Sequence, residues 1–286
     1  MPMPSRRRSA WQAAFFHALL SISTGVGCRG EPQATPEGND APLLLLAQVK
    51  SGLVDRDRRL FAFHLEGRVL EAGSEARFSF DYRAPQRMLG VLHSDGERRL
   101  AFDGEWLYRL EPPLKRLTRT RLGPALSPAQ RAGTLAQIFS PFVPEGFRAP
   151  LLPREREKVE ARQVSHPRAA HAVELRVQAD DPQTGPVEVR YLLRWPALDF
   201  LEKRIDGPGS IQGLVRVTAE HCEPSLKLCV PKALRQSLGD QEGARTDLQT
   251  VSLNQPSPAD SFTIAPPAGF TVLDGARAVS RIENRP

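Results

Sequence analysis

The fold of this chain is decided by residues 61–122, FAFHLEGRVLEAGSEARFSFDYRAPQRMLGVLHSDGERRLAFDGEWLYRLEPPLKRLTRTRL. In its segments FAFHL (61–65) and RFSFDY (77–82), bulky apolar residues alternate with small or polar ones, which is the period-2 pattern of strands with one apolar face. Two Asp-Gly pairs, at 95–96 and 103–104, mark places where the chain reverses, because Gly tolerates the positive φ of tight turns. The stretch therefore predicts an antiparallel meander with one face that packs against apolar material.

Two helices are expected beside the strands. The first covers 42–55 after a cap at Asn39 or Asp40, and four consecutive leucines at 43–46 make it so apolar that we expect the helix to be covered. The second covers 127–139, where the run Ser-Pro-Ala-Gln places Ser at the N-cap, Pro at the first helical position and Gln three residues after the cap.

A second set of strands follows, separated by turns rich in Gly, Pro and Asp. These strands are expected at 171–177, 187–195, 201–205, 214–221 and 248–253, with a last short strand at 262–264. The order of elements predicts a mainly β fold: a single unclosed antiparallel β-barrel, or a strongly curved sheet, with about two helices against its concave side. We expect this domain to cover residues 42–273 and a frayed tail to follow at 274–286.

The N-terminus carries an export signal. Three arginines at 6–8 precede an apolar run at 10–22, and small residues then lead to Cys28, an order typical of a signal peptide at 1–27. The apolar run is too short to span a bilayer as a permanent helix. Cys28 follows directly after Gly, which resembles the lipidation site of bacterial lipoproteins, although that site has Leu where Gly25 stands here. We expect a lipidated Cys28 followed by a flexible tether at 28–41; cleavage by the ordinary signal peptidase is the alternative.

The charge of the chain gives no case for a nucleic acid as partner. Residues 1–27 contribute three arginines and no acid, so the remainder has 36 basic residues (39 − 3) and 33 acidic ones, a net charge of +3. This excess is spread along the chain rather than gathered in one segment. We expect an ordinary solvated surface.

Cys222 and Cys229 are expected to form a disulfide. They flank the turn-like segment EPSLKL, and lipidation of Cys28 would leave them as the remaining pair of cysteines. Export would place this pair in an oxidising compartment. A bridge across so short a loop stabilises the fold by about 2–3 kcal/mol. A zinc site that includes His221 is the alternative, but there is no second Cys pair and the spacing matches no common zinc motif.

No catalytic, metal or cofactor motif is found in the sequence. It contains no G-x-S-x-G, no H-E-x-x-H and no phosphate-binding glycine loop. We therefore expect a protein that is not an enzyme and that needs neither metal nor cofactor. A hydrolase on this scaffold would need a polar cluster assembled from distant residues.

Four segments, taken in order, carry a family resemblance. They are 80–85 (FDYRAP), 102–108 (FDGEWLY), 112–116 (PPLKR) and 254–270 (NQPSPADSFTIAPPAGF). Together they resemble the periplasmic lipoprotein carriers and their outer-membrane acceptors, the LolA/LolB-like superfamily. The resemblance implies an unclosed β-barrel whose hydrophobic cavity, covered by helices, accepts acyl chains. The chain departs from the family at Ala84, where carriers place an arginine that helps to hold the lid shut, and at Met88, where they place a phenylalanine.

These observations predict an exported periplasmic protein, anchored to the outer membrane through Cys28, that binds the acyl chains of lipids or lipoproteins as a monomer. Burial of apolar chain atoms would supply the affinity. The alternative is an envelope structural or interaction lipoprotein with the same fold and a filled cavity. The candidate ligand-binding residues are Phe61, Phe63, Phe78, Phe80, Met88, Trp106, Tyr108, Leu135 and Phe139.

Overall fold

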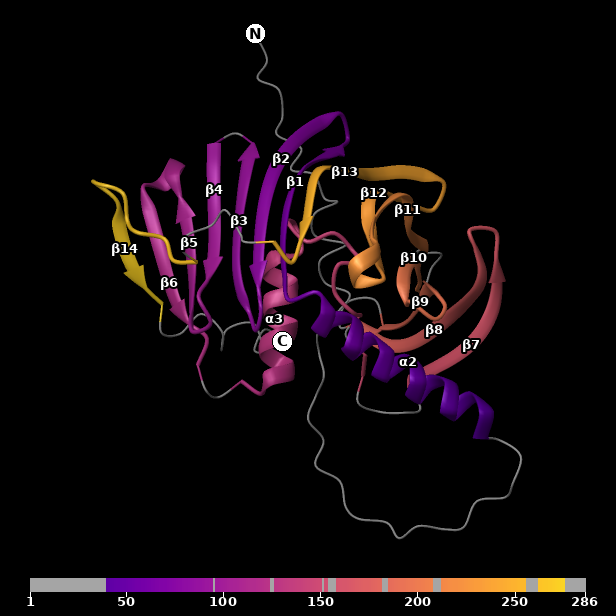
Figure 1. The fold of residues 1–286 in the computed structure, drawn as a ribbon. Coiled ribbons are helices and arrows are strands. Elements are labelled where there is room, and N and C mark those ends of the chain that lie inside the picture. The colour runs from indigo at the N-terminus through magenta and orange to yellow at the C-terminus, as the bar shows by residue number, and fades with distance from the viewer. Residues whose placement is uncertain are drawn as a thin grey trace.

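The structure is a computed structural model that describes residues 40–94, 96–123, 126–150, 152–153, 158–181, 185–207, 212–255 and 262–275. The signal peptide, Cys28 and most of the expected tether lie outside the described residues, as do Asp95 and residues 276–286 of the expected tail. Within the described part, the strands form one large curved sheet with two helices against it (Figure 1).

The first six strands form the predicted meander, in which each strand pairs antiparallel with the next. Between the fourth and fifth strands, the Asp103 carboxylate accepts hydrogen bonds from the backbone N–H groups of Glu105 and Trp106, at 2.9 and 2.8 Å. This closes the second Asp-Gly turn. The strands are β1 (Ala62–Glu71), β2 (Ser74–Arg83), β3 (Arg87–Ser94), β4 (Gly96–Phe102), β5 (Trp106–Glu111) and β6 (Arg116–Arg121).

Seven further strands form a second antiparallel meander, which joins the first where β13 pairs with β1. A final short strand, β14 (Thr271–Asp274), lies parallel to β6. The described strands leave the sheet unclosed, with β14 and β7 at its two edges, so the predicted mainly β fold with an open curved sheet is confirmed. The second set comprises β7 (Val159–His166), β8 (Ala169–Asp181), β9 (Gly185–Arg194), β10 (Asp199–Asp206), β11 (Gln212–Glu223), β12 (Leu228–Leu238) and β13 (Gln241–Leu253).

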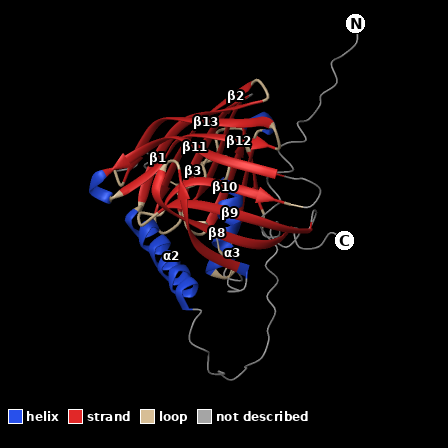
Figure 2. Cartoon of the chain, turned by 90° about the vertical axis from the view of Figure 1, so that its right-hand side faces the viewer, coloured by secondary structure: helices blue, strands red, loops and turns tan. Residues whose placement is uncertain are grey.

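Helix α2 (Asp40–Arg59) covers the second half of the sheet and extends four residues beyond its expected end. Leu46, Val49 and Leu53 repeat at helical spacing and are buried against these strands. The sheet thus covers the helix as expected, while Leu43 and Leu44 lie on another face of the helix and remain 55% and 61% exposed. Figure 2 shows both helices below the arch of strands.

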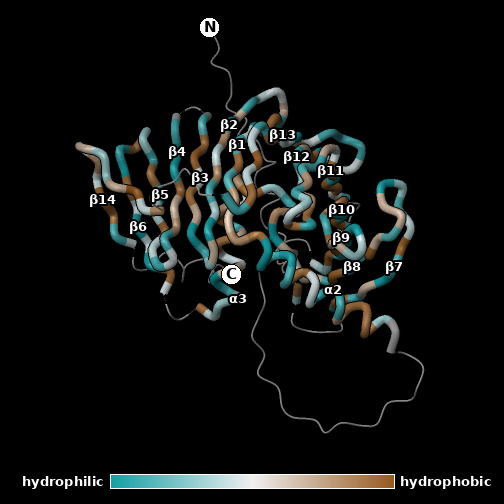
Figure 3. Tube along the Cα trace, viewed as in Figure 1, coloured by the Kyte–Doolittle hydropathy of each residue, from teal (hydrophilic) through white to brown (hydrophobic). Residues whose placement is uncertain are grey.

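Helix α3 (Pro128–Phe139) covers the first half of the sheet. Its predicted capping box is confirmed: the Ser127 hydroxyl accepts from the backbone N–H of Gln130, and the Gln130 side chain accepts from the backbone N–H of Ser127. Leu135 and Phe139 are buried in the cluster that this helix forms with β1, β2, β4 and β5. The alternation of hydrophilic and hydrophobic residues that creates this buried face is visible along the strands in Figure 3.

The C-terminal segment packs on the outer, convex face of the sheet. The expected strand at 262–264 is not formed there; instead, Phe262 and Ile264 are buried as parts of an irregular segment, and Ile264 packs with residues of β4, β5 and β6. Asp274, expected at the start of the tail, ends β14 and pairs with Arg119 at 2.8 Å. The last strand of the sheet is therefore β14, which begins at 271, seven residues after the end of the expected strand at 264.

Two hairpins share one turn structure that follows from a shared sequence. Segments 111–115 (EPPLK) and 223–227 (EPSLK) both form a single 3-10 turn followed by a lysine in the left-handed region, at φ 44° for Lys115 and 49° for Lys227. The second hairpin also carries the predicted disulfide, Cys222–Cys229, which is confirmed. Because the two sulfurs are bonded to each other, they are not available as zinc ligands.

Candidate functional site

The space beneath α3 is a packed core. Phe63, Phe78, Phe80, Leu135 and Phe139 are all buried there, and Met88 packs at the margin. Ring centroids lie 5.8 Å apart for Phe63 and Phe80, and 5.9 Å apart for Phe80 and Phe139, which are distances of direct aromatic contact. The structure therefore brings together most of the residues predicted to bind ligand, but their side chains fill the interior with one another.

The other three predicted residues lie elsewhere. Phe61 precedes β1 and is 52% exposed. Trp106 and Tyr108 project from the convex face, because Leu107 between them points into the concave core and alternate residues of a strand face opposite ways. The Tyr108 hydroxyl donates to Asp103 at 2.9 Å, and partial burial together with this carboxylate raises the pKa of Tyr108. Both aromatic side chains therefore lie outside the concave interior.

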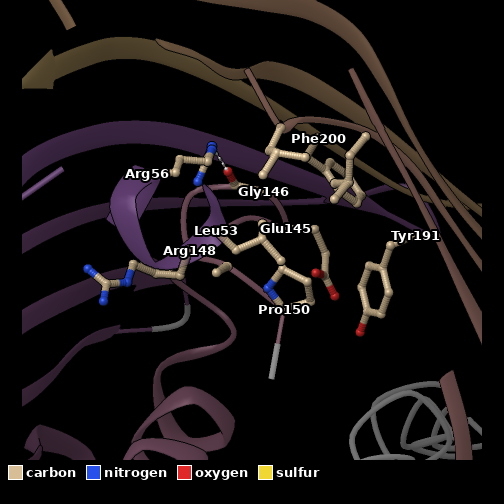
Figure 4. A pocket seen from close by; sticks show the side chains of 11 residues that line it. Leu53, Arg56, Glu145, Gly146, Arg148, Pro150, Tyr191 and Phe200 are labelled. Atoms are coloured by element: carbon tan, nitrogen blue, oxygen red, sulfur yellow. Dashed lines mark hydrogen bonds between the residues drawn. The ribbon is translucent and has the colours of Figure 1, made fainter. Parts of the chain in front are cut away.

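The interior beneath α2 is also filled. Its cavity measures about 10 Å³ and is lined by Leu53, Arg56 and Tyr191 among others (Figure 4), which leaves space for one water at most. The Arg56 side chain is 1% exposed and donates from Nη2 to the Gly146 carbonyl at 2.5 Å and from Nη1 to the Phe147 carbonyl at 3.4 Å. Burial lowers the pKa of Arg56. This buried guanidinium ties α2 to the segment that follows α3.

A second buried cation fixes the same segment. Lys203 in β10 pairs with Glu145, and its ammonium lies 5.6 Å from the centre of the Tyr191 ring. Burial alone would lower the pKa of Lys203, but the Glu145 carboxylate outweighs it and the pKa is raised, so the ion pair stays charged. Gly146 has φ +89°, and a Cβ there would lie 2.5 Å from Phe200, so the close approach of this loop requires glycine.

A groove of about 630 Å³ lies at the surface along the flank of α2, next to the cavity beneath this helix, and both are lined by Leu53 and by residues 148–150. Three parts of the chain form the groove: one flank of α2 with Phe61, the turn between β2 and β3, and residues 148–150 with 152–153. Val54 and Phe61 are apolar and 50% and 52% exposed. The residues that line the groove are Lys50, Leu53, Val54, Asp57, Arg58, Phe61, Tyr82, Ala84, Pro85, Arg148, Ala149, Pro150, Leu152 and Pro153.

The inner wall of this groove is held in place by Asp57. Its carboxylate pairs with Arg148 at 3.1 Å and accepts from the backbone N–H of Ala149 at 2.9 Å. The Arg148 guanidinium also lies over the Tyr82 ring, 4.7 Å from its centre, in a cation–π contact. Burial raises the pKa of Tyr82, so this ring remains neutral at the base of the groove. The walls are thus fixed before any ligand arrives.

Of the residues predicted from the sequence to bind ligand, only Phe61 lines the groove. Lys50, Val54 and Arg58 follow one face of α2 at helical spacing, a signal that can be found in the sequence. Arg148 and Leu152 come from an irregular segment, whose position against α2 no local pattern encodes. The described residues contain no group of three or more His, Cys, Asp or Glu side chains placed to hold a metal ion. None of the described helices is long and apolar enough to cross a membrane.

Comparisons with known proteins find similarity in structure alone. No family model matches the chain, and no curated protein matches it in sequence. An outer membrane lipoprotein-sorting protein domain from Vibrio parahaemolyticus has a TM-score of 0.45 and 11% identity, over 75% of this chain and 97% of that one. A LolA superfamily protein from Nitrosomonas europaea has a TM-score of 0.43 and 12% identity, over 72% and 94%.

A DUF1329 family protein from Desulfovibrio piger has a TM-score of 0.43 and 10% identity, over 73% of this chain and 95% of that chain. The Nitrosomonas structure is thus named after the LolA superfamily, which segments of this sequence resemble, and the Vibrio structure is named after lipoprotein sorting. At TM-scores below 0.5, no functional residue is transferred from them to this chain.

Proposed function

We propose that this protein is an exported, lipid-anchored protein of the cell envelope that holds an acyl chain in the surface groove beside α2, as a monomer and without catalysis. The groove carries the proposal. Its volume of about 630 Å³ falls among those of small-molecule sites, about 300–1,000 Å³. In its walls, Val54 and Phe61 remain about half exposed to water. The apolar residues on the concave side of the sheet are instead buried in two packed cores.

Burial of apolar surface would supply the binding energy. Each CH₂ group that leaves water contributes about 0.8 kcal/mol, so complete burial of a chain of ten carbons contributes about 8 kcal/mol, the free energy of a micromolar complex before the cost of association is subtracted. The rigid wall formed by Asp57, Arg148 and Ala149 reduces the ordering that binding requires. The family resemblance of segments 80–85 and 102–108 supports acyl chains as the ligand class.

The packed interior favours one other candidate, an envelope interaction lipoprotein that binds no lipid. The aromatic side chains that would line a cavity are in contact with one another, and the cavity beneath α2 holds about 10 Å³. In that case the exposed side chains of the groove would contact a protein. The two candidates differ in whether the purified protein binds a small apolar ligand.

Saturable binding of the neutral dye N-phenyl-1-naphthylamine, followed by fluorescence, tests the proposal. The V54N/F61N variant is expected to weaken dye binding at least about tenfold, because both apolar contacts are lost. The control variant L114N/V272N removes two apolar side chains of similar exposure, 59% and 38%, at the far edge of the sheet, and is expected to bind like the original protein. Absence of saturable dye binding, or an equal loss of binding in both variants, would overturn the proposal and favour the alternative, an envelope interaction lipoprotein.

A further inference from the structure

The groove combines apolar walls with a cationic rim. Among the described residues, Lys50, Arg58 and Arg148 line it, together with one acid, Asp57. That acid is already engaged, since it pairs with Arg148 and accepts from Ala149. The described part of the lining therefore carries a net charge of +2, from three cations and one carboxylate.

The cations lie beside the apolar residues in an order that fits an amphiphile. Lys50, Val54 and Arg58 are spaced four residues apart and follow one face of α2, and Phe61 continues this line at the end of the helix. The Arg58 side chain is 76% exposed and pairs at 3.2 Å with Asp55, whose side chain is 61% exposed. Exposed pairs of this kind are weak and exchange readily for another anion.

We propose that the ligand of this groove is an anionic amphiphile, an acyl chain whose polar end carries a phosphate or carboxylate. This inference rests on the proposed acyl-chain binding and adds the charge of the headgroup. The chain lies against Val54, Phe61 and Leu152, and the headgroup is held at the rim by Lys50 and Arg58. Arg148 is already bound to Asp57 and serves as a fixed positive wall.

Competition against the bound dye, with four compounds at concentrations below micelle formation, tests the inference. The compounds are decyl phosphate, decyl maltoside, decyltrimethylammonium and inorganic phosphate. Decyl phosphate is expected to displace the dye at a concentration about five- to tenfold lower than decyl maltoside, and the cationic compound is expected to be the weakest of the three amphiphiles. Inorganic phosphate is expected to displace nothing, which separates a lipid headgroup from free phosphate as the ligand.

A variant without the charges of Lys50 and Arg58 tests whether these two residues cause the preference for decyl phosphate. K50Q/R58Q is expected to lose the preference for decyl phosphate and to keep its affinity for decyl maltoside. The control K232Q/R235Q makes the same change of charge at exposed residues of β12 and is expected to keep the preference. The preference should also fall as salt rises, because exposed charges are screened within about 10 Å at 0.1 M salt.

The outcomes separate the two proposals. Equal affinity for all three amphiphiles, or equal effects of the two variants, overturns the anionic headgroup and leaves acyl-chain binding in place. Displacement by inorganic phosphate alone overturns the amphiphile. Failure of every amphiphile to displace the dye overturns acyl-chain binding itself.

Discussion

Substitution of Gly90 by alanine tests whether the interior is filled. Gly90 lies in β3, and a Cβ placed there would be 2.8–2.9 Å from three carbons of the Phe142 ring, closer than real side chains approach. The ring is 3% exposed and lies 6.4 Å from that of Phe80 and 6.3 Å from that of Phe139, so it has no free space into which to move. We expect Gly90→Ala to reduce the free energy of unfolding by about 1–3 kcal/mol, the usual cost of overpacking.

Urea unfolding, followed by circular dichroism, measures this cost. A second variant, Phe142→Leu, shortens the opposing side chain, so the double variant should lose at least about 1 kcal/mol less than the sum of the single losses. Gly123→Ala serves as the control, because nothing lies within 4 Å of a Cβ at that position. Without a clash, alanine at position 90 would be neutral or stabilising by about 0.5–1 kcal/mol, since it restricts the unfolded chain.

A result in which Gly90→Ala unfolds like the original protein would refute the reasoning. It would mean that the Phe142 ring moves aside at no cost and that the space beneath α3 is not packed. The interior would then be large enough to compete with the surface groove for an acyl chain. Additive single losses would likewise show that the methyl group and the ring do not meet.

Three further predictions concern the stability of the fold and its disulfide. Arg56→Met is expected to lower the free energy of unfolding in urea by about 2–4 kcal/mol, because two buried carbonyls lose their donor. Arg58→Met at the surface should change it by less than about 0.5 kcal/mol. Equal costs would contradict the role of the buried Arg56 guanidinium. The Asp81 carboxylate, which is hydrogen-bonded to His64, raises the pKa of His64. The stabilisation that this hydrogen bond gives the folded protein is therefore complete below the unfolded pKa of about 6.5 and is lost as pH rises through the raised pKa of the folded state. His64→Gln should therefore flatten the fall of unfolding free energy as pH rises above about 6.5, and an unchanged slope would count against the hydrogen bond between His64 and Asp81. Titration of the unfolded, unreduced protein should find at most one free thiol; two or more would contradict the Cys222–Cys229 bridge.

Local signals predicted the elements whose structure is decided locally. The Ser127 capping box begins α3 because both of its hydrogen bonds lie within four residues. The turn at Asp103 and Gly104 forms because one carboxylate satisfies two nearby N–H groups and Gly104 takes φ +111°. The alternation in β2 predicts its buried face because Phe78, Phe80 and Tyr82 pack in the core beneath α3.

Other elements depend on partners that are distant in sequence. Strand β12 was not predicted, since LCVPKALRQSL contains Pro231 and several helix-favouring residues, and its structure comes from pairing with β11 and β13. Phe262 and Ile264 show the alternation of a strand, yet they pack on the sheet without joining it. The face to which Trp106 points depends on the register across a hairpin, which the spacing of aromatic residues does not contain.

The candidate site shows the same limit. Lys50, Val54 and Arg58 can be read from the sequence as one face of a helix. The opposite wall of the groove comes from the turn at Pro85 and from residues near Arg148, which tertiary contacts bring to α2 from two other parts of the chain. A surface groove built from three segments therefore has no single signature in the sequence.

The pairing of β1 with β13 has a consequence for the order in which this protein is made. Phe63 in β1 meets Leu253 in β13, a partner that is synthesised 190 residues later. Because a chain leaves the ribosome or the export channel from its N-terminus, β1 has one unpaired side for nearly the whole of synthesis. One of the two central strands of the finished sheet is thus an edge strand in the nascent protein, with the risk of wrong pairing that an edge carries. Polar substitutions on the outer face of β1 should therefore change the yield of folded protein more than the stability of the product.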